Sequence, residues 1–219
     1  MSDGCASCRG ACCRDVVVRV SMFDMWRISR ALGLPFGELV DPCLDETCGE
    51  GSLALDASGD RYLPVLQRNP RDESACVFLM RVGEDIARCG IYAARPEICD
   101  AYPFEIVRGA IDLRSDVRCS PDAWNLATLD YRALRARHER FLTEWVAHAS
   151  ATAEFVRLPR ADSVASSFAA YLDFCEALCE RAVAVRSHDA RPAFALDRVT
   201  DYARELVATL RFRSLPTQA

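Results

Sequence analysis

The stretch CASCRGACC, residues 5–13, carries four of the twelve cysteines of this 219-residue chain. Its opening CxxC spacing lets two thiolates of one tight turn reach a common metal ion, at the Zn–S distance of about 2.3 Å. Cys12 or Cys13 can supply a third ligand. Because adjacent side chains of an extended segment point to opposite sides, these two thiols can serve two neighbouring ions, or one ion and a free reactive position. We therefore expect metal ligation to organise this region.

Four further cysteines extend the cluster downstream. Cys89 and Cys99 lie in the turn-rich segment RCGIYAARPEICDAYPFE, residues 88–105, where Pro96 and Pro103 restrict the backbone and pre-shape the loop. Eight thiolates together can form two four-sulfur sites. The predicted metal ligands are Cys5, Cys8, Cys12, Cys13, Cys76, Cys89, Cys99 and Cys119.

Arginines accompany these cysteines. Four thiolates leave a charge of about −2 on Zn²⁺ or on a [4Fe–4S]²⁺ core, and guanidinium or backbone N–H groups that bond to sulfur would offset it. The same arginines can equally be ordinary surface residues of an arginine-rich chain. Those within four residues of a cluster cysteine are Arg9, Arg14, Arg88, Arg95 and Arg118.

Composition narrows the class of protein. The N-terminus lacks the basic start and apolar run of a secretory signal, and no apolar run is long enough to span a membrane, so a cytoplasmic location is expected. In a reducing cytosol, dense cysteines favour metal or redox chemistry over disulfides. The net charge of −5, with scattered basic residues, argues against nucleic-acid binding. The absence of lysine excludes Schiff-base chemistry and a phosphate-binding loop.

The pattern predicts a predominantly helical α+β fold, with a cysteine-cluster metal-binding domain over 1–120 and a helical domain over 121–219. Ser120, Pro121 and Asp122 form a helix start signal, from which a helix is expected to about His148. Two more apolar stripes follow, over 164–182 and 199–210, and a short helix is expected over 23–32. Short strands are predicted at 16–20, 62–66, 75–80, 104–107 and 110–113.

These motifs resemble a known family. The chain resembles the YkgJ-type cysteine-cluster proteins, which are described as a zinc- or iron-chelating domain. The resemblance rests on CxxCxxxCC at 5–13, CVFL at 76–79, CGIYAARPEICDAYPF at 89–104 and RC at 118–119. The resemblance implies eight metal-binding cysteines and extends to the flagellin lysine N-methylases, whose cluster is associated with an iron–sulfur centre. Asp100, where a basic residue is usual, and the proline of CSP at 119–121 depart from the pattern.

The sequence leaves the metal open. All-sulfur ligation suits both zinc and iron, including a [4Fe–4S] cluster. Zinc held by four thiolates favours a structural module, whereas an iron–sulfur centre permits the alternative of a protein-modifying enzyme resembling lysine N-methylases. A redox dithiol and inert thiols are the competing interpretations of the N-terminal cluster. No sequence feature identifies a protein partner or a substrate.

The remaining cysteines and the histidines favour structural roles. Cys175 and Cys179 fall on an apolar helical stripe and are expected in the core. Cys43 and Cys48 are either auxiliary ligands or loop thiols. His138, His148 and His188 are too scattered to form a ligand set.

Overall fold

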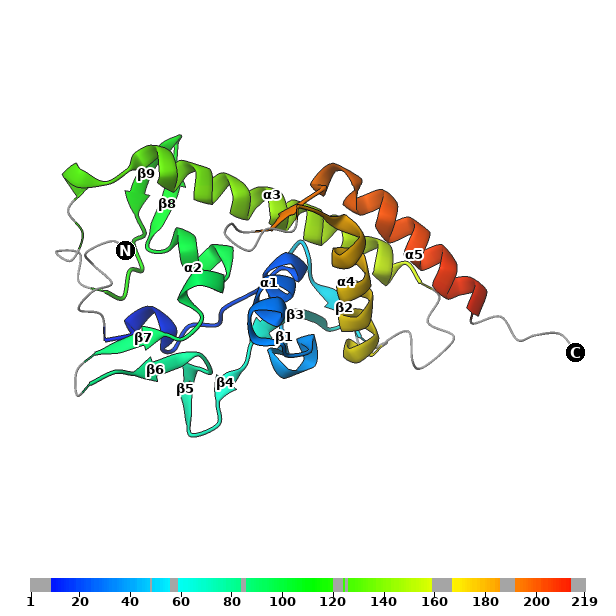
Figure 1. The fold of residues 1–219 in the computed structure, drawn as a ribbon, viewed down its shortest axis with the longest axis horizontal. Helices are drawn as coiled ribbons and strands as arrows, with labels where there is room; N and C mark the ends of the chain where they lie inside the picture. Colours follow the sequence, from blue (N-terminus) through cyan, green and yellow to red (C-terminus); the bar gives the residue numbers. More distant parts are fainter. Residues whose placement is uncertain are drawn as a thin grey trace, which may run out of the picture. The chain divides into compact units, whose positions relative to one another are not determined.

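The computed structural model describes residues 9–47, 49–55, 59–83, 86–119, 124, 126–158, 167–185 and 192–213. The described residues contain five α-helices and eleven short strands (Figure 1). The fold is mixed α+β, as predicted. The expectation that it is predominantly helical is not confirmed, since 47% is helical and 23% is strand.

The α-helices are α1 (Met22–Leu32), α2 (Glu97–Ala101), α3 (Tyr131–Val156), α4 (Phe168–Ala182) and α5 (Val199–Arg213). The strands are β1 (Val40–Leu44), β2 (Leu53–Ala54), β3 (Arg61–Leu66), β4 (Arg68–Asn69), β5 (Asp72–Cys76), β6 (Leu79–Arg81), β7 (Ala87–Cys89), β8 (Phe104–Val107), β9 (Ala110–Leu113), β10 (Val183–Val185) and β11 (Ala193–Phe194). Short 3₁₀ turns are η2 (Ala11–Cys13), η3 (Phe36–Glu38), η4 (Tyr92–Ala94), η6 (Leu126–Thr128) and η7 (Leu196–Arg198).

The strands form small sheets. One sheet has three strands in the order β1–β3–β2, and the others are the antiparallel pairs β4–β5, β6–β7, β8–β9 and β10–β11. Two-stranded pairs bury little apolar surface and are marginally stable by themselves. Four of the five sheets therefore depend on what packs against them.

The chain groups into two compact units, each built from two segments. Unit 1 comprises 1–19 and 66–142, and unit 2 comprises 20–65 and 143–219. The six predicted ligand cysteines that the structure describes all belong to unit 1. The sequence analysis places a domain boundary near residue 120, between a metal-binding domain and a helical domain. This division stays a prediction.

Local capping explains α1 of unit 2. Ser21 accepts a hydrogen bond from the Asp24 backbone N–H, and the Asp24 carboxylate accepts one from the Ser21 N–H, which is a capping box. Gly33 ends the helix at φ 69°, a left-handed conformation that glycine adopts without strain. The predicted helix over 23–32 is confirmed.

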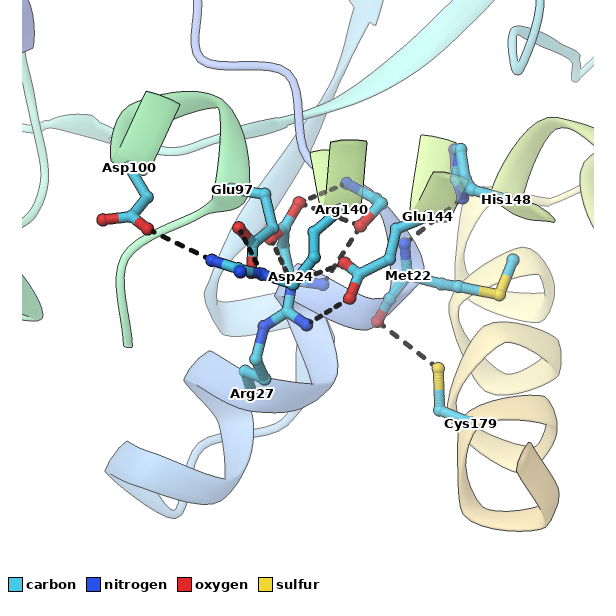
Figure 2. Close-up of polar contacts among 10 residues, drawn as sticks. Met22, Asp24, Arg27, Glu97, Asp100, Arg140, Glu144, His148 and Cys179 are labelled. Atoms are coloured by element: carbon cyan, nitrogen blue, oxygen red, sulfur yellow. Dashed lines mark hydrogen bonds and ion pairs between the residues drawn. The ribbon is translucent and has the colours of Figure 1, made fainter. Parts of the chain in front are cut away.

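A buried polar network connects α1 to α3 and α4 within unit 2 (Figure 2). The Arg27 guanidinium donates to both Glu144 carboxylate oxygens, at 2.8 and 2.7 Å, and to Asp24 at 2.7 Å. The Met22 backbone N–H donates to Nδ1 of the fully buried His148 at 3.2 Å, and the Cys179 thiol donates to the Met22 carbonyl at 3.4 Å. Burial lowers the pKa of His148 to about 4, so its ring is neutral near pH 7.

Helices α4 and α5 and the C-terminal part of α3 carry much of the apolar core of unit 2. Phe155 of α3 contacts Tyr171 and Phe174 of α4, and Tyr171 shares a hydrogen bond of 2.9 Å with Thr152. Cys175 and Cys179 are fully buried in α4, in agreement with the predicted core role. The two later helices follow the predicted stripes, although Val164 lies outside the described residues.

The boundaries predicted for α3 are wrong. The helix begins at Tyr131 and continues to Val156, beyond the expected end at His148. The Asp130 carboxylate accepts a hydrogen bond of 2.9 Å from the Ala133 N–H, so it caps the helix in place of the predicted Ser120. The start signal itself, residues 120–122, lies outside the described residues.

The strand predictions for unit 1 are confirmed where the two paired strands are adjacent in sequence. The hairpin β8–β9, with Gly109 at φ 82° in its turn, has the predicted bounds. The predicted strand 75–80 is instead divided between β5 and β6 by a turn. Residues 16–20 form no strand, and the Val18 carbonyl accepts a hydrogen bond of 2.9 Å from the Leu66 N–H.

No helix in the described part of the chain is long and apolar enough to cross a membrane.

Candidate metal centre

The N-terminal cysteine loop packs on the β6–β7 hairpin of unit 1. Gly10 is buried at φ 77°, just before the 3₁₀ turn that carries Cys12 and Cys13. A Cβ atom at Gly10 would lie 2.6 Å from Leu79 Cδ1 and 3.2 Å from Ala87 Cβ. Glycine is therefore required here by conformation and by space, and the contact holds the loop against the hairpin.

Backbone pairing brings the loop beside β5. Arg14 forms an antiparallel bridge with Ala75, and the Asp15 N–H donates to the Ser74 carbonyl at 2.7 Å. In this register the residue before Arg14 lies opposite the residue after Ala75. Cys13 and Cys76, distant in sequence, are thus neighbours across the bridge.

The β6–β7 hairpin adds a third cysteine on the same side. Leu79 pairs with Cys89 and Arg81 with Ala87, and alternation along antiparallel strands places these four side chains on one face. That is the face on which Gly10 packs. Cys89 therefore lies on the side of the hairpin that meets the cysteine loop.

Two of the cysteine turns share a local geometry. The Phe78 backbone N–H bonds to the Cys76 sulfur, and the Ile91 N–H bonds to the Cys89 sulfur, two residues downstream in each case. A further bond of 2.8 Å from the Gly90 N–H to the Phe78 carbonyl links the two turns. Backbone N–H groups directed at sulfur stabilise a thiolate and are characteristic neighbours of metal-bound cysteine.

Five thiols of unit 1 lie close enough to interact through their charges. A hydrogen bond with Cys12, burial, and the charges of Cys12, Cys99 and Cys76 all raise the pKa of Cys13. Burial also raises the pKa of Cys76 and of Cys89, and neighbouring thiolates raise both further. The interacting set is Cys12, Cys13, Cys76, Cys89 and Cys99.

The sulfur atoms of Cys12 and Cys13 lie 3.9 Å apart. Their hydrogen bond is the main reason that the pKa of Cys12 is lowered to about 7; the Arg95 guanidinium also lowers it, and burial opposes both. A thiol with this pKa is partly ionised at neutral pH, and the thiolate is the form that binds metal. Of the arginines proposed to offset thiolate charge, Arg95 acts on Cys12 and on Cys89.

Cys99 lies in α2, and ion pairs hold the segment around it. Arg95 pairs with Asp100, and its guanidinium lies 4.0 Å from the centroid of the Tyr92 ring. Arg140 of α3 lies near Glu97 and Asp100 of the same unit (Figure 2). Its nitrogen atoms are 3.6 Å from the Glu97 carboxylate and 3.7 Å from the Asp100 carboxylate. Asp100, which departs from the family pattern, thus has cationic partners beside Cys99.

Cys119 has a different partner, one that its sequence context does not reveal. The Trp124 indole N–H donates to the Cys119 sulfur at 3.2 Å, and the Trp124 ring packs edge-on against Phe104 with centroids 5.3 Å apart. Tyr102 accepts a hydrogen bond of 2.7 Å from the Arg118 N–H. Burial raises the pKa of Tyr102, and the charges of Cys119 and Cys12 raise it further, so Tyr102 lies near both thiols.

The described thiols do not by themselves form a finished metal site. Within the described ranges, no three Cys, His, Asp or Glu side chains converge closely enough to bind one ion. Cys5 and Cys8, the opening pair of the predicted ligand set, lie outside these ranges, as does Cys48. The soft sulfur donors and their N–H partners fit zinc or iron chemistry, whereas complete coordination needs further thiols or a local rearrangement.

The other candidates stand apart from this group. The Cys43 thiol, in β1 of unit 2, donates to the Leu44 carbonyl. His148 is buried in the core of unit 2, and His188 lies outside the described residues. His138 is in unit 1, where burial lowers its pKa and the Phe104 backbone contributes a hydrogen bond. None of these interactions links the residue to a cluster cysteine.

Comparison with known proteins assigns the family. The model of the CxxCxxCC family, described as "Putative zinc- or iron-chelating domain", matches residues 4–120, more than half of the chain. The chain belongs to this family, and the predicted resemblance is confirmed. It has three residues, including Gly10, between Cys8 and Cys12, where the family name has two. No curated protein and no solved structure matches the chain, and a similarity to lysine N-methylases is not shown.

Proposed function

We propose that this member of the CxxCxxCC family binds zinc or iron through the thiolates of its family region, with a [4Fe–4S] cluster as one form of the iron. The proposed ligands are Cys5, Cys8, Cys12, Cys13, Cys76, Cys89, Cys99 and Cys119. Cys5 and Cys8 enter the proposal on sequence grounds alone.

The observation that carries the proposal is the gathering of buried and half-buried thiols from separate segments. Neighbouring thiols raise the pKa of Cys13, Cys76 and Cys89, and the last two accept backbone N–H bonds at their sulfur atoms. Burying several free thiols together gains little from packing alone, because each thiol is only a small apolar group with a weak donor. Around a metal ion the same thiols are strong ligands as thiolates. The N–H bonds to sulfur then partly offset the net negative charge of the metal–thiolate site.

The metal would supply cross-links between segments of unit 1. Its sheets are two-stranded pairs, and ligands from the N-terminal loop, the ends of β5 and β7, and α2 would join them at one point. The open geometry of the described thiols implies that ligation and local ordering occur together, as in other small metal-organised domains.

Elemental analysis of anaerobically purified full-length protein tests the proposal. We expect stoichiometric zinc or iron in the wild type and loss of metal when Cys76 or Cys89 is changed to serine. Cys43→Ser is the matched control, since Cys43 lies in unit 2 away from the thiol group. Protein without either metal, or equal loss in the control, would contradict the proposal.

Colour distinguishes the two forms of the site. Iron–sulfur protein absorbs broadly near ~400 nm and is brown, whereas zinc protein is colourless. Each of the eight cysteines changed to serine in turn, with metal content measured for each variant, then identifies the ligands.

A further inference from the structure

A second feature of unit 1 is an open pocket of about 440 Å³ beside the β4–β5 and β6–β7 pairs. None of the proposed ligand cysteines lines it. Its polar lining consists of three arginines, one asparagine and one aspartate, and Leu79 and Ala75 add an apolar part. These residues are Arg14, Arg71, Arg81, Asn69 and Asp72.

The charge of this pocket is unbalanced. Asp72, its single acid, is already engaged: it accepts from Arg14 at 2.7 Å and from the Ser74 hydroxyl at 2.6 Å. These hydrogen bonds lower the pKa of Asp72, so it is ionised and neutralises Arg14. Arg71 and Arg81 are exposed, and among the described residues neither guanidinium is paired with a carboxylate. Two positive charges therefore remain.

The pocket is also rich in donors and poor in acceptors. The Asn69 side-chain oxygen accepts the Arg71 backbone N–H at 2.9 Å, which leaves the amide NH₂ of Asn69 as a donor. Planar guanidinium groups bind carboxylate and phosphate oxygens in pairs of parallel hydrogen bonds. The ion pair with Asp72 fixes Arg14 in advance, which reduces the entropy lost on binding.

We propose that this pocket binds a small doubly charged oxyanion, carried either by phosphate or by paired carboxylates. Arg71 and Arg81 would provide the unpaired charge, and Leu79 would contact any apolar part of the ligand. The whole chain carries a net charge of −5 and does not attract anions at long range. Binding therefore depends on direct contacts in the pocket and weakens as salt increases.

The site is independent of the proposed metal centre but adjoins it. Arg14 directly follows Cys13, and Ala75 directly precedes Cys76. An anion held here would lie next to the segments that carry these thiols.

Isothermal titration of the full-length protein with inorganic phosphate, and separately with citrate, tests the proposal. We expect one of the two to bind, with affinity at least ~10-fold weaker in the double variant Arg71→Gln/Arg81→Gln. Arg132→Gln is the control, because Arg132 is an exposed arginine of unit 1 outside the pocket. Binding of phosphate would identify a phosphate group as the ligand, and binding of citrate would identify paired carboxylates.

The proposal is overturned if neither anion binds below about 10 mM, or if the double variant binds as tightly as the wild type. It is also overturned if Arg132→Gln weakens binding as much as the double variant does. Metal content is measured on the same samples, so a lack of metal bears on the proposed function and a lack of anion binding bears on the pocket. Near-UV circular dichroism checks that the exposed substitutions leave the fold intact.

Discussion

Three described cysteines of unit 1 accept hydrogen bonds at their sulfur atoms. Cys76 and Cys89 accept backbone N–H groups, and Cys119 accepts an indole N–H. Cys179, by contrast, donates its S–H to a backbone carbonyl. A thiol that donates is protonated, whereas a sulfur surrounded by donors is prepared to carry negative charge.

The Trp124 indole provides a direct test of this difference. Trp124→Phe keeps the aromatic contact with Phe104 but removes the N–H donor to Cys119. If Cys119 is a ligand, the loss of this outer bond lowers metal affinity by about 10- to 100-fold. Competition with a chelator of known affinity measures the change.

Trp26→Phe is the matched control for Trp124→Phe. It also removes an indole donor, but that donor bonds to the Glu180 carboxylate in unit 2, at 2.8 Å. We expect metal affinity to be unchanged in this variant. Equal affinity in wild type and Trp124→Phe would show that the N–H···S bond makes no contribution.

His148 predicts a pH dependence of stability. Its pKa is about 4 in the folded protein, against an ordinary value of 6.5, because burial disfavours the charged ring and outweighs the opposing effect of Asp24. The unfolded chain therefore binds a proton more readily than the folded chain between these values, and stability falls as pH decreases through that range. From pH 7 to pH 5 the loss from this one group is about 2 kcal/mol.

His148→Asn isolates this contribution. The asparagine side-chain oxygen can still accept the Met22 N–H, whereas the titrating ring is gone. The variant is less stable than wild type at pH 7 because it leaves a cavity, but the difference between the two proteins should narrow by about 2 kcal/mol at pH 5. Urea unfolding at both pH values measures it. A constant difference would mean that folding does not lower the pKa of His148.

At the scale of elements, α1 is stabilised in two ways. Its caps involve neighbouring residues of the sequence, whereas its buried ion pair includes a residue of α3. The capping residues can be predicted from the sequence because they lie next to the helix they cap. Arg27, Asp24 and Glu144 are buried together, and the two carboxylates would remain without their cation if Arg27 were removed.

Arg27→Ala should lower the free energy of unfolding by about 3–5 kcal/mol, because it leaves buried carboxylates uncompensated. Arg30→Ala, in the same helix, should cost at most about 1 kcal/mol, since the Arg30 side chain is 51% exposed and its pairs with Glu176 and Glu180 are screened by water. Chemical denaturation of both variants tests the contrast. Similar losses in the two variants would show that the buried pair has no special role.

The elements that the sequence predicts well are those whose signals are local. Ser21 and Gly33 define α1, and Gly109 defines the β8–β9 turn, without reference to distant residues. Residues 16–20 have strand-like composition, but β-branched residues form a strand only where a partner completes a ladder. The start of α3 was mispredicted because the helix uses a capping residue ten positions beyond Ser120, namely Asp130.

The same distinction applies to the candidate metal centre. Cysteine spacing identifies the thiols, and five of them do interact in the structure. The sequence does not reveal the Arg14–Ala75 bridge or the Trp124 bond, because both depend on segments that meet only after folding. Gly10 is the exception: a glycine within a cysteine loop is a visible signal for a left-handed turn in close contact with its neighbour.

At the scale of the whole molecule, the two units differ in what stabilises them. Unit 2 has an apolar core that includes the contacts of Phe155 with α4. Unit 1 holds two-stranded pairs and several adjacent thiols, a combination expected to gain much of its stability from ligation.

Metal removal should therefore act on the two units unequally. After anaerobic chelation with metal loss verified, we expect faster hydrogen exchange at the backbone amides of β5, β6 and β7 in unit 1. The amides of α4 in unit 2 should keep their protection, which makes α4 an internal control within the same molecule. Hydrogen exchange followed by mass spectrometry resolves the two sets of peptides. Unchanged exchange in unit 1 would mean that the thiols gather without a metal, and equal acceleration in α4 would mean that the chain unfolds as one cooperative body and that metal stabilises all of it.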